Sequence, residues 1–318
     1  IARAAGLERG RLALGDEVAG WTDDELRAAL PSLSVVARST PDQKERLVRV
    51  ARAAGRTVAV TGDGVNDAPA LSRADVAVAM GSGTAVAREA ADLVLGDDSF
   101  ATLLYALRDG RRIVDNVQKG LVFLVSTHVA LLGFILIATL YGFGQPLLPI
   151  QILWLELFID LSTSIAFERE PGEPDLMRRP PRSPREPLLP AGVLARIVGA
   201  GGFSAVAALA VMVAHPGPLV DARWLAFTVL VAAQVVRAYA NRSLGSPIHR
   251  LGTNRFLLGA GLFVLAVQVV IPLVPPLAEA FQATPLEAGE WLVVAVIALV
   301  PAVVAEVVRS VRRVVWVA

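Results

Sequence analysis

The sequence lacks cysteine, a strong net charge and an N-terminal signal peptide. Without cysteine, its 318 residues can form no disulfide bond and no thiolate metal site. The formal net charge of +1 gives no reason to expect a nucleic-acid partner. The chain starts at Ile1 rather than at a methionine, and no signal peptide follows. We therefore expect it to begin within a domain and to be a fragment.

Hydrophobic residues are abundant, at 54% of the chain, and the mean hydropathy is +0.57. These values are too high for an ordinary soluble domain. Because the apolar excess lies after residue 120, we expect three parts. They are a soluble α/β domain at residues 1–100, a stalk helix at 101–120 and an all-α transmembrane domain at 121–318.

The first 100 residues alternate between predicted strands and predicted helices. Thr22 with Glu25, and Thr40 with Gln43, are typical of the capping boxes that open helices. The expected strands lie at 33–37, 57–60, 75–79 and 92–95, and the expected helices at 22–30, 40–54, 69–73 and 84–91. This alternation predicts a mostly parallel sheet with helices on both faces.

Residues 61–71, Thr-Gly-Asp-Gly-Val-Asn-Asp-Ala-Pro-Ala-Leu, are the most informative stretch. Asp63 comes directly after the apolar strand at 57–60, and ligands bind at the carboxyl ends of strands in open α/β sheets. Asp67 is a second carboxylate four residues on. Two carboxylates beside exposed backbone N–H groups suit a magnesium ion that also holds a phosphate. The alternative is an ordinary turn with no ligand.

Other residue types near this loop fit the same chemistry. Gly62 and Gly64 permit a tight turn with close backbone approach to a ligand, and Asn66 can donate or accept hydrogen bonds. Lys44 falls in the first turn of a predicted helix, where the helix dipole disfavours a cation. That placement would be explained by a lysine that binds an anion. Taken alone, however, the observation favours an ordinary lysine on the solvated surface.

Six apolar stretches after residue 120 are long enough to cross a bilayer of roughly 30 Å. They lie at about 121–141, 147–167, 191–214, 222–240, 255–274 and 290–308. The first continues the stalk, so one helix on the order of 60 Å would run from the soluble domain into the membrane. The arginines that follow the second, fourth and sixth spans are Arg169, Arg178, Arg179, Arg182, Arg185, Arg242, Arg250, Arg255, Arg309, Arg312 and Arg313. The positive-inside rule makes that side, the soluble domain and both chain ends cytoplasmic, which predicts a multi-pass plasma-membrane protein.

Charged and polar residues inside the spans indicate where an ion would pass. Glu156 and Asp160 are four residues apart in the second span, and each would cost about 2.5–3.5 kcal/mol facing lipid near the bilayer centre. They must therefore face a protein or water-filled interior. Either they line an ion pathway, or they pair with arginine or histidine and serve only the assembly of the helices. His128 and Gln234 either share that interior or are packed residues. We expect Arg237, near a cytoplasmic end, to extend towards water rather than act as an internal counter-charge.

Residues 61–71 closely resemble the magnesium-site hinge motif of P-type ATPases, the cation pumps that pass through an aspartyl-phosphate. Three further matches follow in the right order: Thr-Pro-Asp-Gln-Lys at 40–44, Met-Gly-Ser-Gly-Thr-Ala-Val-Ala at 80–87 and Arg-Arg-Pro-Pro-Arg-Ser-Pro at 178–184. The last is similar to the loop after the sixth span in the calcium-type subgroup. The resemblance covers essentially the whole chain and implies a partial haloacid-dehalogenase-like sheet followed by a six-helix transmembrane bundle.

The resemblance also implies roles for the candidate residues. Asp63 would coordinate Mg²⁺ with help from Asp67, Lys44 would neutralise the phosphoryl oxygens, and Asn66 would hold the phosphate. The cation would be carried by Glu156, Asp160 and His128. The nucleophilic Asp-Lys-Thr-Gly motif is absent from the sequence. A domain outside these residues would bind most of the ATP, so we expect the chain alone to be inactive.

The identity of the cation stays open because several membrane residues depart from those of the calcium pumps. His128 and Glu156 stand where those pumps usually carry asparagine, Leu131 and Gln234 where they carry glutamate, and only Asp160 matches. Calcium is the first expectation, and protons or another hard cation the second. Two other functions remain possible: a membrane-tethered phosphohydrolase of the haloacid-dehalogenase type, and a non-catalytic truncated pump.

Overall fold

The computed structural model describes residues 10–183 and 186–317, and the chain divides into one compact unit ending at Leu107 and another beginning at Arg108. Pro184 and Arg185, which belong to the predicted basic connector, lie outside the described residues, as do the side chains of Arg312 and Arg313.

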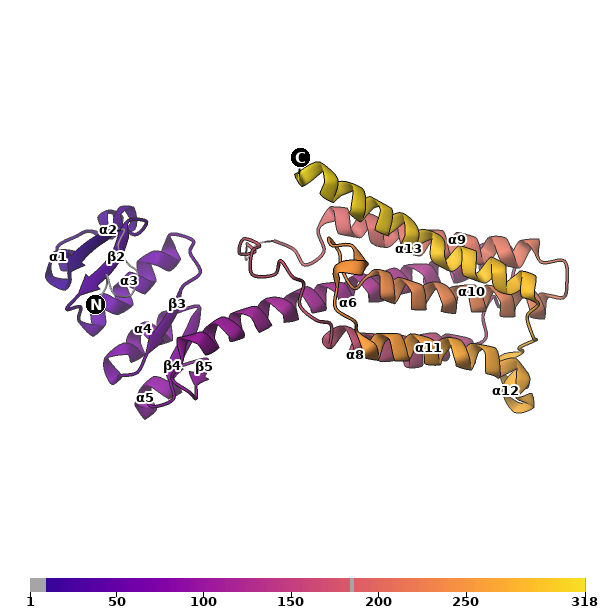
Figure 1. The fold of residues 1–318 in the computed structure, drawn as a ribbon, viewed down its shortest axis with the longest axis horizontal. Helices are drawn as coiled ribbons and strands as arrows, with labels where there is room; N and C mark the ends of the chain where they lie inside the picture. Colours follow the sequence, from indigo (N-terminus) through magenta and orange to yellow (C-terminus); the bar gives the residue numbers. More distant parts are fainter. Residues whose placement is uncertain (1–9, 184–185, 318) are drawn as a thin grey trace. The chain divides into compact units, whose positions relative to one another are not determined.

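The first unit alternates short strands with short helices (Figure 1). Its elements are β1 (Arg11–Leu14), α1 (Gly15–Ala19), α2 (Asp23–Ala29), β2 (Leu33–Ala37), α3 (Pro41–Ala53), β3 (Ala59–Gly62), the 3₁₀ turn η1 (Val65–Asp67), α4 (Ala68–Arg73), β4 (Val76–Met80), α5 (Ala85–Glu89) and β5 (Leu93–Leu95). Both predicted capping boxes are present, and each fixes a helix start within the local sequence.

The strands form two parallel sheets rather than the single predicted sheet. One sheet contains β1 and β2, and the other has the order β3-β4-β5. The prediction of parallel pairing is confirmed, but the single sheet is wrong because β2 pairs with β1, a four-residue strand that sequence analysis missed. Among the described residues, each sheet keeps two edges without a strand partner, those of β1 and β2 in one sheet and of β3 and β5 in the other.

The second unit consists of long apolar helices. Its elements are α6 (Phe100–Leu140, which begins in the first unit), α7 (Pro149–Leu153), the π-helical segment η2 (Trp154–Asp160), α8 (Leu161–Glu168), α9 (Ala191–Ala214), α10 (Leu219–Ala240), the 3₁₀ turn η3 (Ile248–Arg250), α11 (Arg255–Val270), the 3₁₀ turn η4 (Ile271–Leu273), α12 (Pro275–Phe281) and α13 (Ala288–Val317). Within the described part, six helical stretches have the length and composition to cross a membrane, with α7, η2 and α8 together forming the second.

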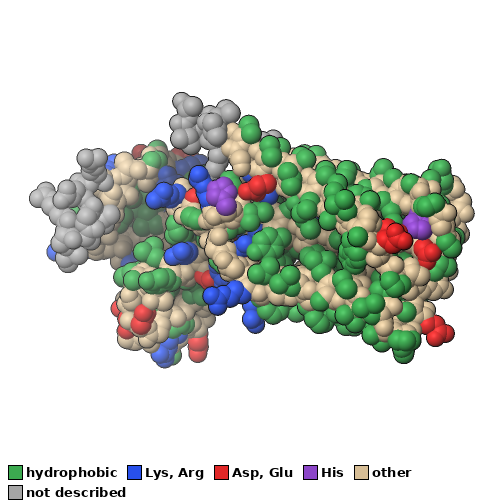
Figure 2. Space-filling view, turned by 45° about the vertical axis from the view of Figure 1, so that its right-hand side comes forward, with side chains coloured by type: hydrophobic (Ala, Val, Ile, Leu, Met, Phe, Trp, Pro, Cys, Tyr) green, Lys and Arg blue, Asp and Glu red, His purple; other side chains and the backbone are tan. Residues whose placement is uncertain are grey.

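Helix α10 forms the centre of this bundle and is its most buried member. It packs against α9, α11 and α13, and its Trp224 and Phe227 join Phe134 of α6 and Ile159 of η2 in the main core. The outer surface is largely hydrophobic on the face shown in Figure 2, with charged side chains gathered towards the two ends of the bundle. Because water would oppose so much exposed apolar surface, this pattern is that of a multi-pass membrane protein.

Candidate functional site

The loop after β3 wraps around the carboxylate of Asp67. Asp67 Oδ1 lies 2.8 Å from Lys44 Nζ, and Oδ2 accepts hydrogen bonds from the backbone N–H groups of Asp63 (3.3 Å) and Gly64 (3.2 Å). Burial acts to raise the pKa of Asp67, but the hydrogen bond from Lys44 and those from the backbone outweigh it, so the pKa lies below its usual range. Asp67 therefore stays ionised and holds the loop closed.

Asp63 has the opposite environment. Its backbone is fixed because its carbonyl accepts a hydrogen bond from Thr84 N–H over 2.8 Å. Its exposed side chain makes no hydrogen bond or ion pair within residues 10–183 and 186–317. A carboxylate held in place by its backbone but free at its oxygens fits Mg²⁺, which binds through one or two carboxylates and keeps several waters. Of the two predicted Mg²⁺ ligands, Asp63 therefore has its carboxylate oxygens available for an ion. Asp67 instead accepts hydrogen bonds from the loop backbone and so holds Asp63 in position.

The two glycines of the loop differ in how much space surrounds them. A Cβ at Gly62 would stand 2.5 Å from the Cβ of Asp67, whereas a Cβ at Gly64 would meet its nearest atom, Asp67 Oδ2, at 3.6 Å. The close approach of Asp67 therefore requires glycine at 62 but not at 64. Asn66 is exposed at the tip of the turn, where its amide could reach a bound anion.

In the second unit, the predicted ion-transport residues come together. His128 of α6 lies with its Nε2 3.1 Å from Glu156 Oε2 and its Nδ1 4.0 Å from Asp160 Oδ2. One ligand atom from each of the three side chains lies within 4.8 Å of the others. Glu156 and Asp160 are both on the π-helical segment η2, and such segments occur frequently at functional sites. These three side chains could hold a hard cation between α6 and η2.

Asp160 is the buried member of this cluster. Its side chain is 7% exposed, against 35% for Glu156 and 40% for His128. It accepts a hydrogen bond of 2.6 Å from Gln234 on α10, so the glutamine that sequence analysis left open lies in contact with this cluster. The nearby Thr163 hydroxyl instead donates to the carbonyl of Ile159 over 2.7 Å.

Arg237 does not extend towards water, so that prediction is wrong. The residue is 7% exposed, and its guanidinium donates to the carbonyls of Ser126 (3.0 Å) and Ala200 (3.2 Å) and to the hydroxyl of Ser204. These acceptors on α6 and α9 replace water as partners, which allows the charge to stay inside the bundle. Arg237 and Gln234 line a cavity of about 10 Å³ together with Thr127 and Leu131.

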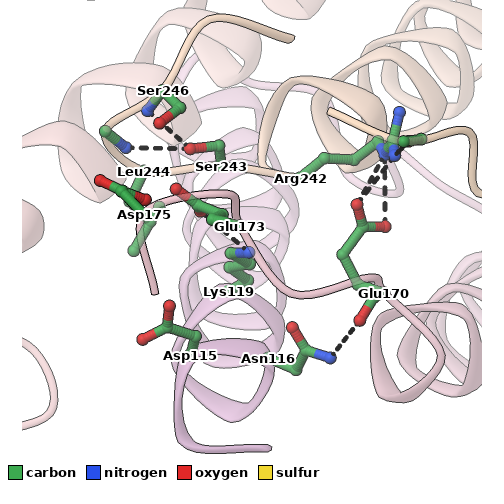
Figure 3. Close-up of polar contacts among 12 residues, drawn as sticks. Asp115, Asn116, Lys119, Glu170, Glu173, Asp175, Arg242, Ser243, Leu244 and Ser246 are labelled. Atoms are coloured by element: carbon green, nitrogen blue, oxygen red, sulfur yellow. Dashed lines mark hydrogen bonds and ion pairs between the residues drawn. The ribbon is translucent and has the colours of Figure 1, made fainter. Parts of the chain in front are cut away.

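A second polar cluster, beside the middle of α6, escaped sequence analysis (Figure 3). Lys119 and Glu173 form an ion pair of 3.0 Å in which each side chain is only 3% exposed. Glu170 pairs with Arg242 through contacts of 2.9–3.2 Å, and its backbone carbonyl accepts a hydrogen bond from Asn116. The proline-rich connector between the second and third spans therefore holds a buried charge, that of Glu173.

Sequence analysis could not detect this cluster because its partners lie far apart in the chain. The acidic residues lie at or near a proline-rich stretch whose composition is typical of a linker. Lys119 lies in the predicted stalk helix at 101–120, where a lysine is typical of a solvent-exposed face. Arg179 adds a further contact to Glu173 of 2.6 Å. Burial acts to raise the pKa of Glu173, but Lys119 and then Arg179 outweigh it, so the pKa is lowered.

Comparisons with known proteins agree with this arrangement. Residues 144–311 match the family described as "Cation transporting ATPase, C-terminus", and residues 45–107 match a "haloacid dehalogenase-like hydrolase" family. The chain is 35% identical over 321 residues to "Calcium-transporting ATPase 1" of Bacillus cereus, covering 94% of this chain and 36% of that protein.

Other relatives show the same coverage. The chain is 35% identical over 298 residues to "Calcium-transporting ATPase" of Bacillus subtilis (92% of this chain, 34% of the relative). It is 37% identical over 290 residues to "Probable cation-transporting ATPase F" of Mycobacterium tuberculosis (89% of this chain, 32% of the relative). The chain thus spans about a third of the length of the curated relatives it matches.

Proposed function

Because this chain belongs to the family of P-type cation-transporting ATPases, we propose that it supplies the magnesium loop and the ion site of an ATP-driven cation pump. The transported cation is calcium in this proposal. The pump passes through an aspartyl-phosphate and lies in the plasma membrane, with the first unit on the cytoplasmic side. The observation that carries the proposal is the group formed by His128, Glu156 and Asp160 between membrane-spanning helices.

The ion site supports a divalent cation through its ligand chemistry. Two carboxylates and an imidazole offer oxygen and nitrogen donors within reach of one ion, and the amide of Gln234 fixes the orientation of Asp160. Calcium favours carboxylate and carbonyl oxygens. A simple membrane anchor would have no use for these acidic groups in a helix that must cross lipid.

The magnesium loop supports the phosphate chemistry. When bound, Mg²⁺ would neutralise charge on phosphoryl oxygens. Asp63 would bind the ion, Asp67 would hold the loop, and Asn66 would orient a phosphate by hydrogen bonding. Lys44 stands beside Asp67, 2.8 Å away, where its ammonium can also face an anion at the carboxyl end of β3.

The open edge of β3 supports a further part of the proposal. A parallel strand added there would end beside Asp63, because the carboxyl ends of parallel strands meet at one edge of a sheet. We infer that a strand from outside these 318 residues fills this edge and carries the phosphorylated aspartate, since the chain has no Asp-Lys-Thr-Gly motif. The 318 residues by themselves would then hydrolyse no ATP.

The test measures ATP-dependent ⁴⁵Ca²⁺ uptake into inside-out vesicles that contain the protein as its gene encodes it. Asp160→Asn should abolish uptake and calcium-stimulated ATP turnover, and Asp63→Asn should abolish both as well. Glu279→Gln, an exposed acidic residue on α12, is the matched control and should leave both unchanged. ATP turnover that continues at the normal rate in Asp160→Asn would instead favour a membrane-tethered phosphohydrolase.

A further inference from the structure

A cavity of about 590 Å³ lies among α6, α9, α10 and α13, apart from the magnesium loop. Its walls are mostly apolar, including Ile197 and Phe203 of α9 and Pro301 and Val304 of α13. The volume falls within the usual range of about 300–1,000 Å³ for small-molecule sites. Val206 of α9, which does not line the cavity, is 60% exposed, so this helix also presents apolar surface on the outside of the bundle.

The charged residues that line this cavity all carry the same sign. They are Arg196, Arg237 and Arg309, and no aspartate or glutamate lines the cavity within the part of the chain that the structure describes. Arg309 is paired with Glu306, which does not itself line the cavity. Over the described residues, the walls therefore present guanidinium groups and no carboxylate, a setting that suits an anion.

Arg309 is the arginine with the most incomplete set of partners. It is 5% exposed, and one terminal nitrogen donates to the carbonyls of Ala240 (2.8 Å) and Ser243 (2.5 Å). Its Nη2 lies 3.1 Å from a carboxylate oxygen of Glu306 without hydrogen-bond geometry. Its Nε has no hydrogen-bond partner among the described residues. A buried guanidinium in this state has donor capacity left for a ligand.

We propose that this cavity binds an anionic phospholipid. Its phosphate contacts Arg309 and Arg196 and at least one acyl chain lies against the apolar walls of α9 and α13. Arginine binds phosphate oxygens with two parallel hydrogen bonds, which accounts for the arginines. A free phosphate ion would leave the apolar walls without a partner, and a lipid without net charge would bring no anionic headgroup to the open Nε donor of Arg309. An anionic phospholipid accounts for both the apolar walls and the arginines.

The site adjoins the ion pathway through Arg237. This residue lines both the lipid cavity and the small cavity beside Gln234. A bound phosphate would therefore lie next to an arginine that also lines the small cavity beside Gln234. This inference goes beyond the proposed transport function, and a binding measurement that needs no ATP turnover tests it.

The experiment is native mass spectrometry of the complete chain, purified in detergent and supplied with phosphatidylglycerol or phosphatidylcholine of identical acyl chains. We expect selective retention of phosphatidylglycerol. Arg309→Gln and Arg196→Gln should each weaken that retention about fivefold, the usual contribution of one arginine near an anionic headgroup. Arg255→Gln, an exposed arginine on α11 outside the cavity, is the matched control and should retain the lipid as the parent does.

A second variant separates lipid binding from folding. Ala302→Trp places bulk in the cavity from α13 without changing any charge, and it should displace phosphatidylglycerol from a protein that remains monodisperse. Equal retention of both lipids by the parent chain would overturn the proposal. So would unchanged phosphatidylglycerol retention in Ala302→Trp, whether or not Arg309→Gln can be purified.

Discussion

Gln234 donates a hydrogen bond of 2.6 Å to Asp160 Oδ1, and this contact joins α10 to the π-helical segment η2. Both residues are buried. The amide leaves one carboxylate oxygen of Asp160 to face His128, whose Nδ1 is 4.0 Å from it. The glutamine therefore orients the acidic residue at the centre of the proposed ion site.

Replacing Gln234 by glutamate should strengthen divalent cation binding. The change keeps the side-chain shape and adds a carboxylate beside Asp160, so a bound cation gains a third negative charge after those of Asp160 and Glu156. Isothermal titration calorimetry of the detergent-purified chain with Ca²⁺ should give on the order of tenfold tighter binding for Gln234→Glu and weaker binding for Gln234→Leu. Gln268→Leu removes another buried glutamine, which donates to Thr228 over 2.9 Å, and should leave Ca²⁺ affinity unchanged. Weaker binding in Gln234→Glu would contradict the assigned role.

Removing the charge of Arg237 should also tighten cation binding. A fixed positive charge beside the site repels the incoming ion, and at an effective dielectric of about 20 such interactions reach about 4 kcal/mol at 4 Å and fall with distance. Arg237→Met should therefore raise Ca²⁺ affinity by on the order of tenfold in the same titration. Arg237→Lys keeps the charge and should retain the parent affinity. Equal affinities for the methionine and lysine variants would show that the guanidinium has no electrostatic role.

Local features of the fold could be predicted from sequence. Thr40 Oγ1 accepts a hydrogen bond from the N–H of Gln43, and Gln43 Oε1 accepts one from the N–H of Thr40, so the start of α3 depends on residues three apart. Part of the hinge loop is equally local, because the backbone N–H groups that donate to the Asp67 carboxylate are those of Asp63 and Gly64.

Long-range partnerships could not be predicted in this way. The pairing of Lys119 with Glu173, and the acceptors of Arg237 on α6 and α9, depend on how helices pack. No periodicity in the sequence encodes such contacts. A polar residue near the end of a span can extend to solvent or can form hydrogen bonds with a buried partner. Only the packing of the helices determines which of the two occurs.

The buried ion pair between Lys119, at the middle of α6, and Glu173 should make the stability of the fold depend on pH. Since the folded-state pKa of Glu173 is lowered, its stabilising effect is fully present above the unfolded-state pKa and is lost as the pH falls through the folded-state pKa. Glu173→Gln leaves Lys119 buried without its partner and should cost about 3–5 kcal/mol near pH 7. Thermal unfolding followed by circular dichroism should show a smaller pH dependence below pH ~5 in this variant.

Asp175→Asn provides the comparison for this pair. Asp175 also contacts Arg179, at 2.8 Å, but its side chain is 40% exposed. Exposed ion pairs contribute about 0–1 kcal/mol, so this variant should unfold close to the parent temperature. Equal losses of stability in Glu173→Gln and Asp175→Asn would contradict the importance assigned to burial.

The two loop glycines provide a matched test of how the magnesium loop is built. Gly62→Ala would bring a methyl group to 2.5 Å from the Cβ of Asp67, so the loop must shift and the contacts of Asp67 with Lys44 and Gly64 must loosen. Overpacking of this kind typically costs about 1–3 kcal/mol. Gly64→Ala meets nothing closer than 3.6 Å, and its backbone φ of −111° suits alanine, so it should cost far less. Mg²⁺-dependent ATP turnover of the protein as its gene encodes it, together with thermal unfolding of each variant, checks both expectations. If Gly64→Ala impaired turnover as strongly as Gly62→Ala at unchanged stability, close backbone approach of a ligand at Gly64, rather than packing around Asp67, would be the reason for its glycine.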